Sequence, residues 1–261
     1  MSDASASTQV THRPQSDDVV IRFVDVWKAF GPKKVFEGLD LNVKKGETLT
    51  IIGGSGTGKS VLLKCLIGLL YPDSGQVLLH DENVAQKNDK ELREVRKRVS
   101  MVFQGAALFD SLTVGENIAY PLREHLKLTD DELNARVAKN LKMVNLAGIE
   151  NMRPSDLSGG MRKRVGLARA IAIEPEIILY DEPSTGLDPI STRVIDELIL
   201  SMKDKLGCTQ IVVTHDMDSA FRISDRMAML AHRKIVAEGT VAEMKRSTQP
   251  DVRAFLDARA S

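Results

Sequence analysis

An eight-residue glycine-rich segment, Gly53 to Ser60, constrains the fold of this chain more than any other feature. It follows the predominantly apolar stretch 48–52 and precedes a second apolar run, a pattern typical of a buried strand, a loop and a helix. The segment fits the pattern G-x-x-x-x-G-K-[ST], whose glycines let successive backbone N–H groups point inward at an anion. Chance would produce such a match in roughly one chain of this length per hundred, so we expect an α/β core that holds phosphate groups.

The residues of this loop suit separate tasks. Lys59 would reach the β and γ phosphates of a nucleotide, and the Ser60 hydroxyl would bind Mg²⁺. The N-terminal end of the following helix would add its partial positive charge. The predicted nucleotide-binding set is the whole loop and the residue after it: Gly53, Gly54, Ser55, Gly56, Thr57, Gly58, Lys59, Ser60 and Val61.

A second apolar strand, 177–182, ends in two adjacent carboxylates, Asp181 and Glu182. Such a strand typically lies beside a phosphate-binding loop, where one carboxylate holds Mg²⁺. We assign that role to Asp181, acting through water. Glu182 would stay off the metal and polarise the attacking water as a general base. A surface acidic turn is the alternative for this pair taken alone.

The flanking sequence predicts further elements. Partly alternating, β-branched stretches at 19–26 and 39–43, with a turn at 31–32, predict an antiparallel start. Apolar residues at helical spacing predict a helical insertion between the two phosphate-site elements. They are Leu133, Val137, Leu141 and Val144.

Composition excludes several classes of protein. The 36 basic and 36 acidic side chains balance, so nothing in the charge calls for a nucleic-acid partner. Cys65 and Cys208 are far apart in apolar or strand-like contexts, which favours buried thiols in a reducing compartment over a disulfide framework. The most apolar run, 61–71, is about half of the roughly 20 residues that a membrane-spanning helix needs. We therefore expect a chain that does not span a membrane alone.

The segment 157–161 reads Leu-Ser-Gly-Gly-Met and is similar to the LSGGQ motif of ABC ATPases. Read alone, Ser-Gly-Gly is a flexible turn. Its position before a helix expected at 161–172 favours the motif. The resemblance implies that Ser158, Gly159 and Gly160 present donors to the γ-phosphate bound by a second copy of the chain, so that two chains close head to tail around two ATP molecules.

Four other residues match further motifs of this family, in the family's order. Phe30 resembles the aromatic that stacks on adenine, and strand-end packing is its alternative role. Gln104 resembles the Q-loop glutamine, and an exposed loop residue is the alternative. Asp188 ends a match to the D-loop, and His215 resembles the switch histidine, although a lone histidine is usually structural. The resemblance implies catalytic roles for Glu182, His215 and Gln104. It implies Mg²⁺ ligation by Ser60, Gln104 and Asp181.

The resemblance implies a P-loop NTPase fold of the ABC ATPase type, an α/β fold with an antiparallel β subdomain and a helical insertion subdomain. We expect the ATPase domain at 19–261 after a disordered tail at 1–18, which has no apolar stretch long enough for a secretory signal. The helical subdomain is expected at about 112–160, and a short helical extension at about 240–261.

Two groups of apolar residues are left with open alternatives. Leu108 and Phe109 begin the insertion, and they are candidates for a groove that receives a coupling helix from a transmembrane partner. Their alternative role is in the core of the insertion. Val252, Phe255 and Leu256 recur at helical spacing, and they could pack on the core, on a second copy or on a partner.

Several stretches are most similar to one branch of the family, the Mla-type phospholipid transporters. They are 107–114, 121–125, 157–165 and 180–183, with Met161 where most ABC ATPases carry Gln. The resemblance implies a peripheral ATPase at the cytoplasmic face of the inner membrane. It implies a transmembrane permease, a periplasmic MCE-domain subunit and a small STAS-domain subunit as partners, with ATP and Mg²⁺ bound and phospholipid as cargo.

Three alternatives remain beside this one. The chain could energise an ABC transporter for a small solute. It could be a soluble ABC ATPase of DNA repair or translation, although repair ATPases carry long coiled coils and translation factors carry two ATPase domains in one chain. It could be a non-hydrolysing scaffold, against which the intact Glu182 and His215 argue.

Overall fold

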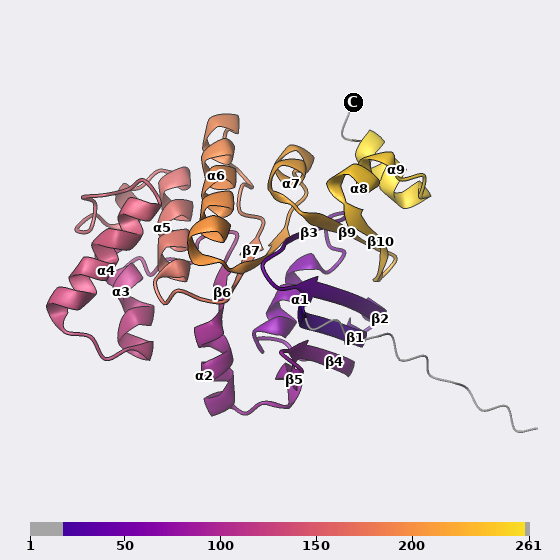
Figure 1. Ribbon diagram of the computed structural model, residues 1–261, viewed down its shortest axis with the longest axis horizontal. Helices are drawn as coiled ribbons and strands as arrows, with labels where there is room; N and C mark the ends of the chain where they lie inside the picture. The colour runs from indigo at the N-terminus through magenta and orange to yellow at the C-terminus, as the bar shows by residue number, and fades with distance from the viewer. Residues whose placement is uncertain (1–17, 259–261) are drawn as a thin grey trace, which may run out of the picture.

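The structure is a computed structural model, and it describes residues 18–258. Apart from Asp18, the tail predicted at 1–18 lies outside this range, as do the last three residues of the predicted C-terminal extension. Two sheets organise the described residues, and helices surround the larger one (Figure 1). The predicted α/β fold with an antiparallel part and a helical part is confirmed.

The smaller sheet forms from the N-terminal region. Its strands, in spatial order, are β2 (Lys33–Lys44), β1 (Val19–Phe30), β4 (Ser74–Leu79) and β5 (Glu82–Asn83), and all neighbours are antiparallel. The turn between β1 and β2 contains Gly31, whose φ of 56° is a left-handed conformation that glycine adopts without strain. This tight hairpin pairs Phe30 directly with Lys33. The end of β1 therefore presents an aromatic side chain beside a lysine.

The larger sheet carries the strands that surround the glycine-rich loop. Their spatial order is β10 (Lys234–Thr240), β9 (Arg226–Ala231), β3 (Thr48–Ile52), β8 (Thr209–Val213), β7 (Ile177–Asp181) and β6 (Val99–Val102), with only β10 antiparallel to its neighbour. Strands β3, β7 and β8 are buried along their whole length, as parallel strands covered on both faces are. Because their carboxyl ends meet at one edge, the segments that follow them lie close together.

Helices cover both sides of this sheet and extend beyond one end. They are α1 (Lys59–Leu66), α2 (Asp89–Arg98), α3 (Val114–His125), α4 (Asp130–Met143), α5 (Gly159–Ile171), α6 (Pro189–Leu206), α7 (Met217–Ile223), α8 (Val241–Arg246) and α9 (Pro250–Asp257), with 3₁₀ turns η1 (Val84–Gln86) and η2 (Pro154–Asp156). Helices α3 and α4 lie at the left end of Figure 1, opposite the smaller sheet. Both begin at a capping box, Thr113 with Glu116 and Thr129 with Glu132.

Buried side chains explain why the helical region packs as predicted. The apolar residues on α4 and at its end join one buried cluster with residues of α3, α5 and α6. Those residues are Leu133, Val137, Leu141 and Val144. The i, i+4 spacing therefore marks the face that α4 turns to the core.

The C-terminal helices pack on the core, which is one of the three placements that the sequence left open. Val252 of α9 is fully buried, and Phe255 and Leu256 pack against the same cluster. That cluster includes Ile52 at the end of β3 and Met229 of β9. The last two helices therefore pack over β9 and the end of β3, where the glycine-rich loop begins.

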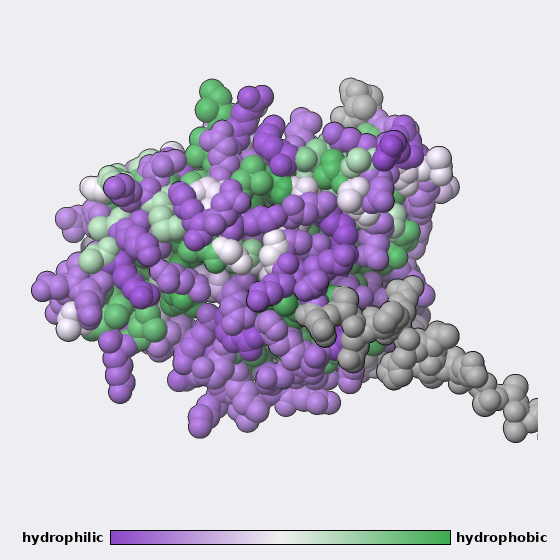
Figure 2. Space-filling model, viewed as in Figure 1, coloured by the Kyte–Doolittle hydropathy of each residue, from purple (hydrophilic) through white to green (hydrophobic). Residues whose placement is uncertain are grey.

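The outer face seen in Figure 2 is mostly hydrophilic, with scattered hydrophobic side chains. Within residues 18–258, no helix is both long enough and apolar enough to cross a membrane.

Both cysteines are buried free thiols, and we expect neither to react in the native chain. Burial raises the pKa of the Cys65 thiol to about 11 and also raises the pKa of Cys208. At pH 8 almost no reactive thiolate is then present. Titration with an aromatic disulfide reagent should detect almost no fast thiol in buffer and both thiols in denaturant. A rapidly reacting thiol in the folded chain would contradict this burial.

Candidate functional site

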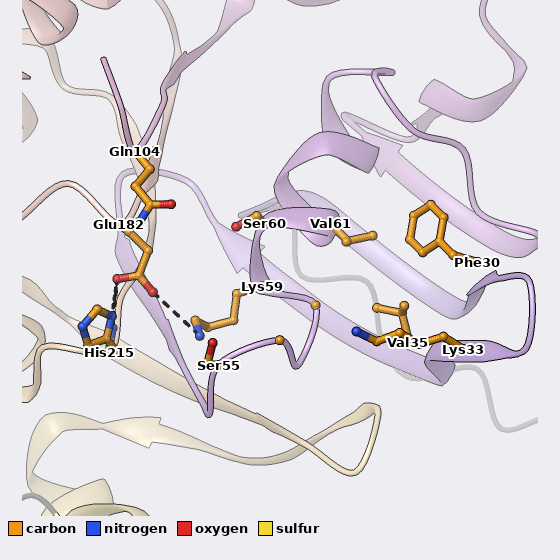
Figure 3. Close-up of a pocket in the computed structure, with 12 residues that line it drawn as sticks. Phe30, Lys33, Val35, Ser55, Lys59, Ser60, Val61, Gln104, Glu182 and His215 are labelled. Atoms are coloured by element: carbon orange, nitrogen blue, oxygen red, sulfur yellow. Dashed lines mark hydrogen bonds and ion pairs between the residues drawn. The ribbon is translucent and has the colours of Figure 1, made fainter. Parts of the chain in front are cut away.

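A cavity of about 550 Å³ lies where the segments after β3, β7 and β8 converge (Figure 3). One wall is the glycine-rich loop and the start of α1, and the smaller sheet supplies another. The predicted site residues that line it are Phe30, Ser55, Gly56, Gly58, Lys59, Ser60, Val61, Gln104, Glu182 and His215. The fold therefore brings together residues from five separate parts of the chain.

Two glycines of the loop are required by close contacts. A Cβ on Gly53, whose φ is 155°, would lie 2.4 Å from the carbonyl oxygen of Leu230. A Cβ on Gly58, whose φ is 109°, would lie 2.5 Å from a methyl carbon of Val35. Gly53, Gly54 and Thr57 do not line the cavity, but the Thr57 hydroxyl donates to the Gly54 carbonyl at 3.0 Å and so helps to shape the loop.

Lys59 is the buried cation of the site. Its Nζ donates to the carbonyl oxygens of Gly53 and Gly54, at 3.0 Å each. The same Nζ lies 3.8 Å from Oε1 of Glu182. The ammonium group is therefore folded over the loop and held between it and the carboxylate, where an incoming phosphate would meet it.

Glu182 is held in a strained and fixed position. Its φ of 50° is left-handed, which is costly for a residue with a side chain and is common at functional sites. Oε2 accepts hydrogen bonds from the Thr185 hydroxyl at 3.1 Å and the His215 backbone N–H at 3.3 Å, and lies 2.7 Å from His215 Nδ1. Oε1 faces Lys59. One carboxylate oxygen is thus anchored, while the other points toward the phosphate-binding loop.

A pair of oxygen donors lies beside the loop. The Ser60 hydroxyl donates to Oδ1 of the buried Asp181 at 2.6 Å. Hydroxyl and carboxylate oxygens suit Mg²⁺, and the Gln104 amide lines the same cavity. In the described part of the chain, no three His, Cys, Asp or Glu side chains could hold a metal ion by themselves. The donor set therefore fits Mg²⁺ that shares its ligands with substrate phosphates, which is how this ion is usually bound.

An aromatic surface forms the other end of the cavity. Phe30 is 45% exposed, so it is not packed away at the strand end. The Lys28 ammonium lies 5.2 Å from its ring centroid, and Lys33, Val35 and Val61 line the cavity around it. Lys33 and Val35 were missed at the sequence level, although the tight turn at 31–32 could have placed Lys33 opposite Phe30.

If Phe30 stacks on the adenine of ATP, as the family resemblance implies, replacing it with Ala should raise the KM for ATP, because stacking of a base on an aromatic side chain contributes about 1–3 kcal/mol. We expect an increase of roughly five- to hundredfold, with kcat at saturating ATP within about twofold of the wild-type value. Replacement by Tyr, which keeps the ring, is the control and should preserve KM. Steady-state ATPase kinetics measure both, and an unchanged KM in the Ala variant would favour a packing role instead.

The predicted residues of the Ser-Gly-Gly segment and Asp188 lie away from this cavity. Ser158 accepts a hydrogen bond from Met161 N and caps α5, and Asp188 accepts from Ile190 N and Ser191 N and caps α6. Ser158, Gly159 and Asp188 are exposed, and a Cβ on Gly160 would lie 3.5 Å from the Ser191 hydroxyl. These residues form a second surface where the starts of α5 and α6 meet.

A half-buried lysine that the sequence did not single out joins that surface to the cavity. Lys163 of α5 donates to the carbonyl oxygens of Glu182 at 3.4 Å and Thr185 at 2.6 Å. Burial lowers the pKa of Lys163, so the amine is held in a weakly solvated position. No local pattern marks such a residue, because its partners are backbone atoms about 20 positions away.

A second cavity, of about 420 Å³, forms a largely apolar groove between α3, β6 and α5. Phe109 is 43% exposed and lines it, with its ring centroid 5.0 Å from that of Tyr120. Leu108 does not line this groove and packs against the buried cluster of the helical region. For Leu108 this packing favours the alternative role in the core of the insertion, and only Phe109 lines the groove.

Comparison with known proteins identifies relatives of this chain. A family profile described as ABC transporter matches residues 36–185, which include the glycine-rich loop and Glu182. The intermembrane phospholipid transport system ATP-binding protein MlaF of Escherichia coli K12 is 42% identical over 236 residues, covering 90% of this chain and 88% of that protein. The probable ribonucleotide transport ATP-binding protein mkl of Mycobacterium leprae is 41% identical over 241 residues, covering 92% and 70%.

A solved structure is similar in fold. It is the dimeric post-hydrolysis state of an ATP-binding cassette bound to ADP and Pi, with a TM-score of 0.78 and 32% identity. The match covers 85% of this chain and 98% of that one. The similarity therefore extends over nearly the whole of a cassette that forms dimers.

Proposed function

This chain belongs to the ABC transporter family, and from that premise we propose that it is the ATP-hydrolysing subunit that energises phospholipid movement between an inner and an outer membrane. The observation that carries the proposal is the meeting of Lys59 with the anchored Glu182 in one cavity. The identity to a phospholipid transport ATPase over most of both chains supports the cargo.

Each part of the cavity suits one part of ATP. The base would stack on Phe30, and the phosphates would lie on the loop, where Lys59 can exchange its carbonyl partners for phosphate oxygens. Ser60, Asp181 and Gln104 would hold Mg²⁺, which neutralises phosphate charge when bound. Glu182 takes a proton from water as the water oxygen bonds to the γ-phosphorus, and the bond to the bridging oxygen of ADP breaks. His215 keeps that carboxylate oriented.

A second copy of the chain would complete the site. ABC cassettes form dimers, as the related solved structure illustrates. Ser158 and Gly159 lie exposed at the N-terminal end of α5, and they do not line the nucleotide cavity of their own chain. A helix start with free N–H groups suits a phosphate, so a head-to-tail pair would present this surface to the γ-phosphate held by the other copy. Asp188 would lie at the same interface.

The apolar groove suits a helix from a permease. Phe109 and Tyr120 are both more than 40% exposed, which is unusual for large apolar side chains unless they meet a partner. An amphipathic helix would lay its apolar face there. The chain would thereby be held at the cytoplasmic face of the inner membrane as a peripheral subunit, with MCE-domain and STAS-domain proteins in the same complex.

Purification from the native cell tests this assembly. The tagged chain is extracted gently from membranes, and mass spectrometry identifies the proteins and lipids that accompany it. We expect a permease, an MCE-domain protein, a STAS-domain protein and phospholipid. A permease with a soluble solute-binding protein and ribonucleotide, in line with the mkl relative's name, would overturn the cargo. The absence of any membrane protein would overturn the transport role.

A further inference from the structure

The segment 103–109 connects the nucleotide cavity with the apolar groove. Gln104 lines the cavity, whereas Phe103, Ala107 and Phe109 line the groove. Within a few residues, the same loop therefore meets both the substrate and the surface assigned to the permease. A change in the conformation of this loop would therefore alter both the nucleotide cavity and the groove.

The middle of this segment is strained. Ala106 and Ala107 have φ values of 62° and 48°, both in the left-handed region. Two consecutive alanines rarely adopt it, because Cβ approaches the following carbonyl oxygen at a cost of about 1–2 kcal/mol per residue. The backbone N–H of Ala106 donates to the Phe103 carbonyl at 2.9 Å and closes a tight turn. Other contacts must hold this turn in place.

One end of the segment is anchored to α3. The fully buried Asn117 accepts a hydrogen bond from Phe109 N at 2.8 Å, and its amide donates to Phe109 O at 3.1 Å. The same amide donates to the carbonyls of Leu112 and Thr113. Phe109 is thus fixed, so the freedom of the segment lies between Gln104 and Ala107.

A single arginine of α5 grips the strained turn. The Arg169 guanidinium donates to Ala106 O at 2.8 Å and to Ala107 O at 2.7 Å. Its central carbon lies 6.0 Å from the Phe109 ring centroid, and the side chain lines the groove. One turn earlier on α5, a Cβ on Gly166 would lie 3.1 Å from the Ala106 Cβ. The helix and the turn therefore lie in close contact. The planar Arg169 guanidinium binds both carbonyl oxygens of the strained turn.

We propose that Arg169 is a positioning residue that holds the left-handed Ala106–Ala107 turn and thereby keeps Gln104 at the nucleotide cavity. This inference rests on the proposed ATPase function and adds a residue to it. Because Arg169 also lines the groove, a helix seated there touches the group that holds the turn. The groove and Gln104 are then coupled through one side chain.

The test compares Arg169→Met with Arg164→Met. Arg164 is a matched control on the same helix, since it donates to the carbonyls of Val144 and Asn145, and Asn145 also has a left-handed φ of 58°. Both variants lose an arginine that grips a turn, but only Arg169 grips the one next to Gln104. We expect kcat for ATP to fall about tenfold in R169M, with KM within about twofold, and kcat in R164M to stay within about twofold of the wild-type value.

A second comparison separates positioning from general stability. Ala106→Gly removes the steric cost of the left-handed φ, so the turn needs its clamp less. The R169M loss of kcat should be at least about threefold smaller in the A106G background than in the wild-type background. Thermal unfolding of all variants shows which of them fold. If R169M does not fold, R169K takes its place in the test, because lysine keeps a single donor group. We expect kcat for ATP to fall about threefold in R169K, for the same reason as in R169M.

Three results would overturn the inference: no loss in R169M, an equal loss in R164M, or the same loss in both backgrounds. Each of them leaves the ATPase assignment standing, provided that the wild-type chain hydrolyses ATP. A wild-type chain without ATPase activity would instead overturn the proposed function itself.

Discussion

Replacing Glu182 with Gln is expected to lower ATP turnover about a hundredfold or more while ATP binding stays close to the wild-type level. The carboxylate is the candidate general base, and removal of such a group typically costs 10²–10⁴-fold. Glutamine has nearly the same shape and can still accept from Thr185 and His215 N–H through its amide oxygen, so the cavity should keep its form. In the presence of ATP the variant should accumulate as closed dimers, which size-exclusion chromatography would detect.

The control for this variant is Glu176→Gln. Glu182 follows strand β7 and Glu176 precedes it, so the two residues lie at opposite ends of the strand. Glu176 pairs with Arg98 and His80, away from the cavity. Its replacement should leave kcat within about twofold. If the Glu182 variant turned over ATP at the wild-type rate, Glu182 would not be the general base. His215 would then be the remaining candidate for that role.

Replacing Lys59 with Ala is expected to weaken ATP binding strongly and to abolish turnover. The Lys59 ammonium is the buried cation at the end of the cavity where the phosphates would bind. Hydrogen bonds from a charged donor contribute about 1.5–3 kcal/mol each. The loss also leaves Glu182 without its positive neighbour, so its charge would repel the γ-phosphate. We expect at least about tenfold weaker binding of ATP by titration calorimetry.

Lys64→Ala provides the comparison for that measurement. Lys64 lies in the last turn of the same helix, α1, and does not line the cavity. Its replacement should leave the ATP affinity within about twofold. If the two variants bound ATP equally well, the phosphate site could not be where Lys59 lies.

The parts of the fold that could be predicted from the sequence are those governed by local pattern. Strand β3 begins and ends at the predicted residues, and β7 begins at the predicted residue and ends one residue earlier, at Asp181, because burial on both faces demands an uninterrupted apolar run. Helix α5 begins at Gly159, two residues before the prediction. The Ser158 side chain caps the helix there and outweighs the poor helix propensity of two glycines.

The features that could not be predicted depend on contacts between distant parts of the chain. Lys163 and Arg169 bind backbone carbonyls that no sequence motif specifies. Leu108 and Phe109 are alike in composition, and only the fold of their loop decides that Leu108 faces the core and Phe109 the groove. The placement of α9 against Met229 likewise needed the sheet to be formed first.

The central claim is that ATP hydrolysis by this chain drives phospholipid movement, and reconstitution tests it most directly. The intact membrane complex containing the chain is placed in vesicles with fluorescent phospholipid, and lipid transfer is followed with and without ATP. Our account predicts ATP-dependent transfer with the wild-type chain and almost none when the complex carries Glu182→Gln. Transfer that proceeds equally without ATP, or equally with the Glu182 variant, would contradict it.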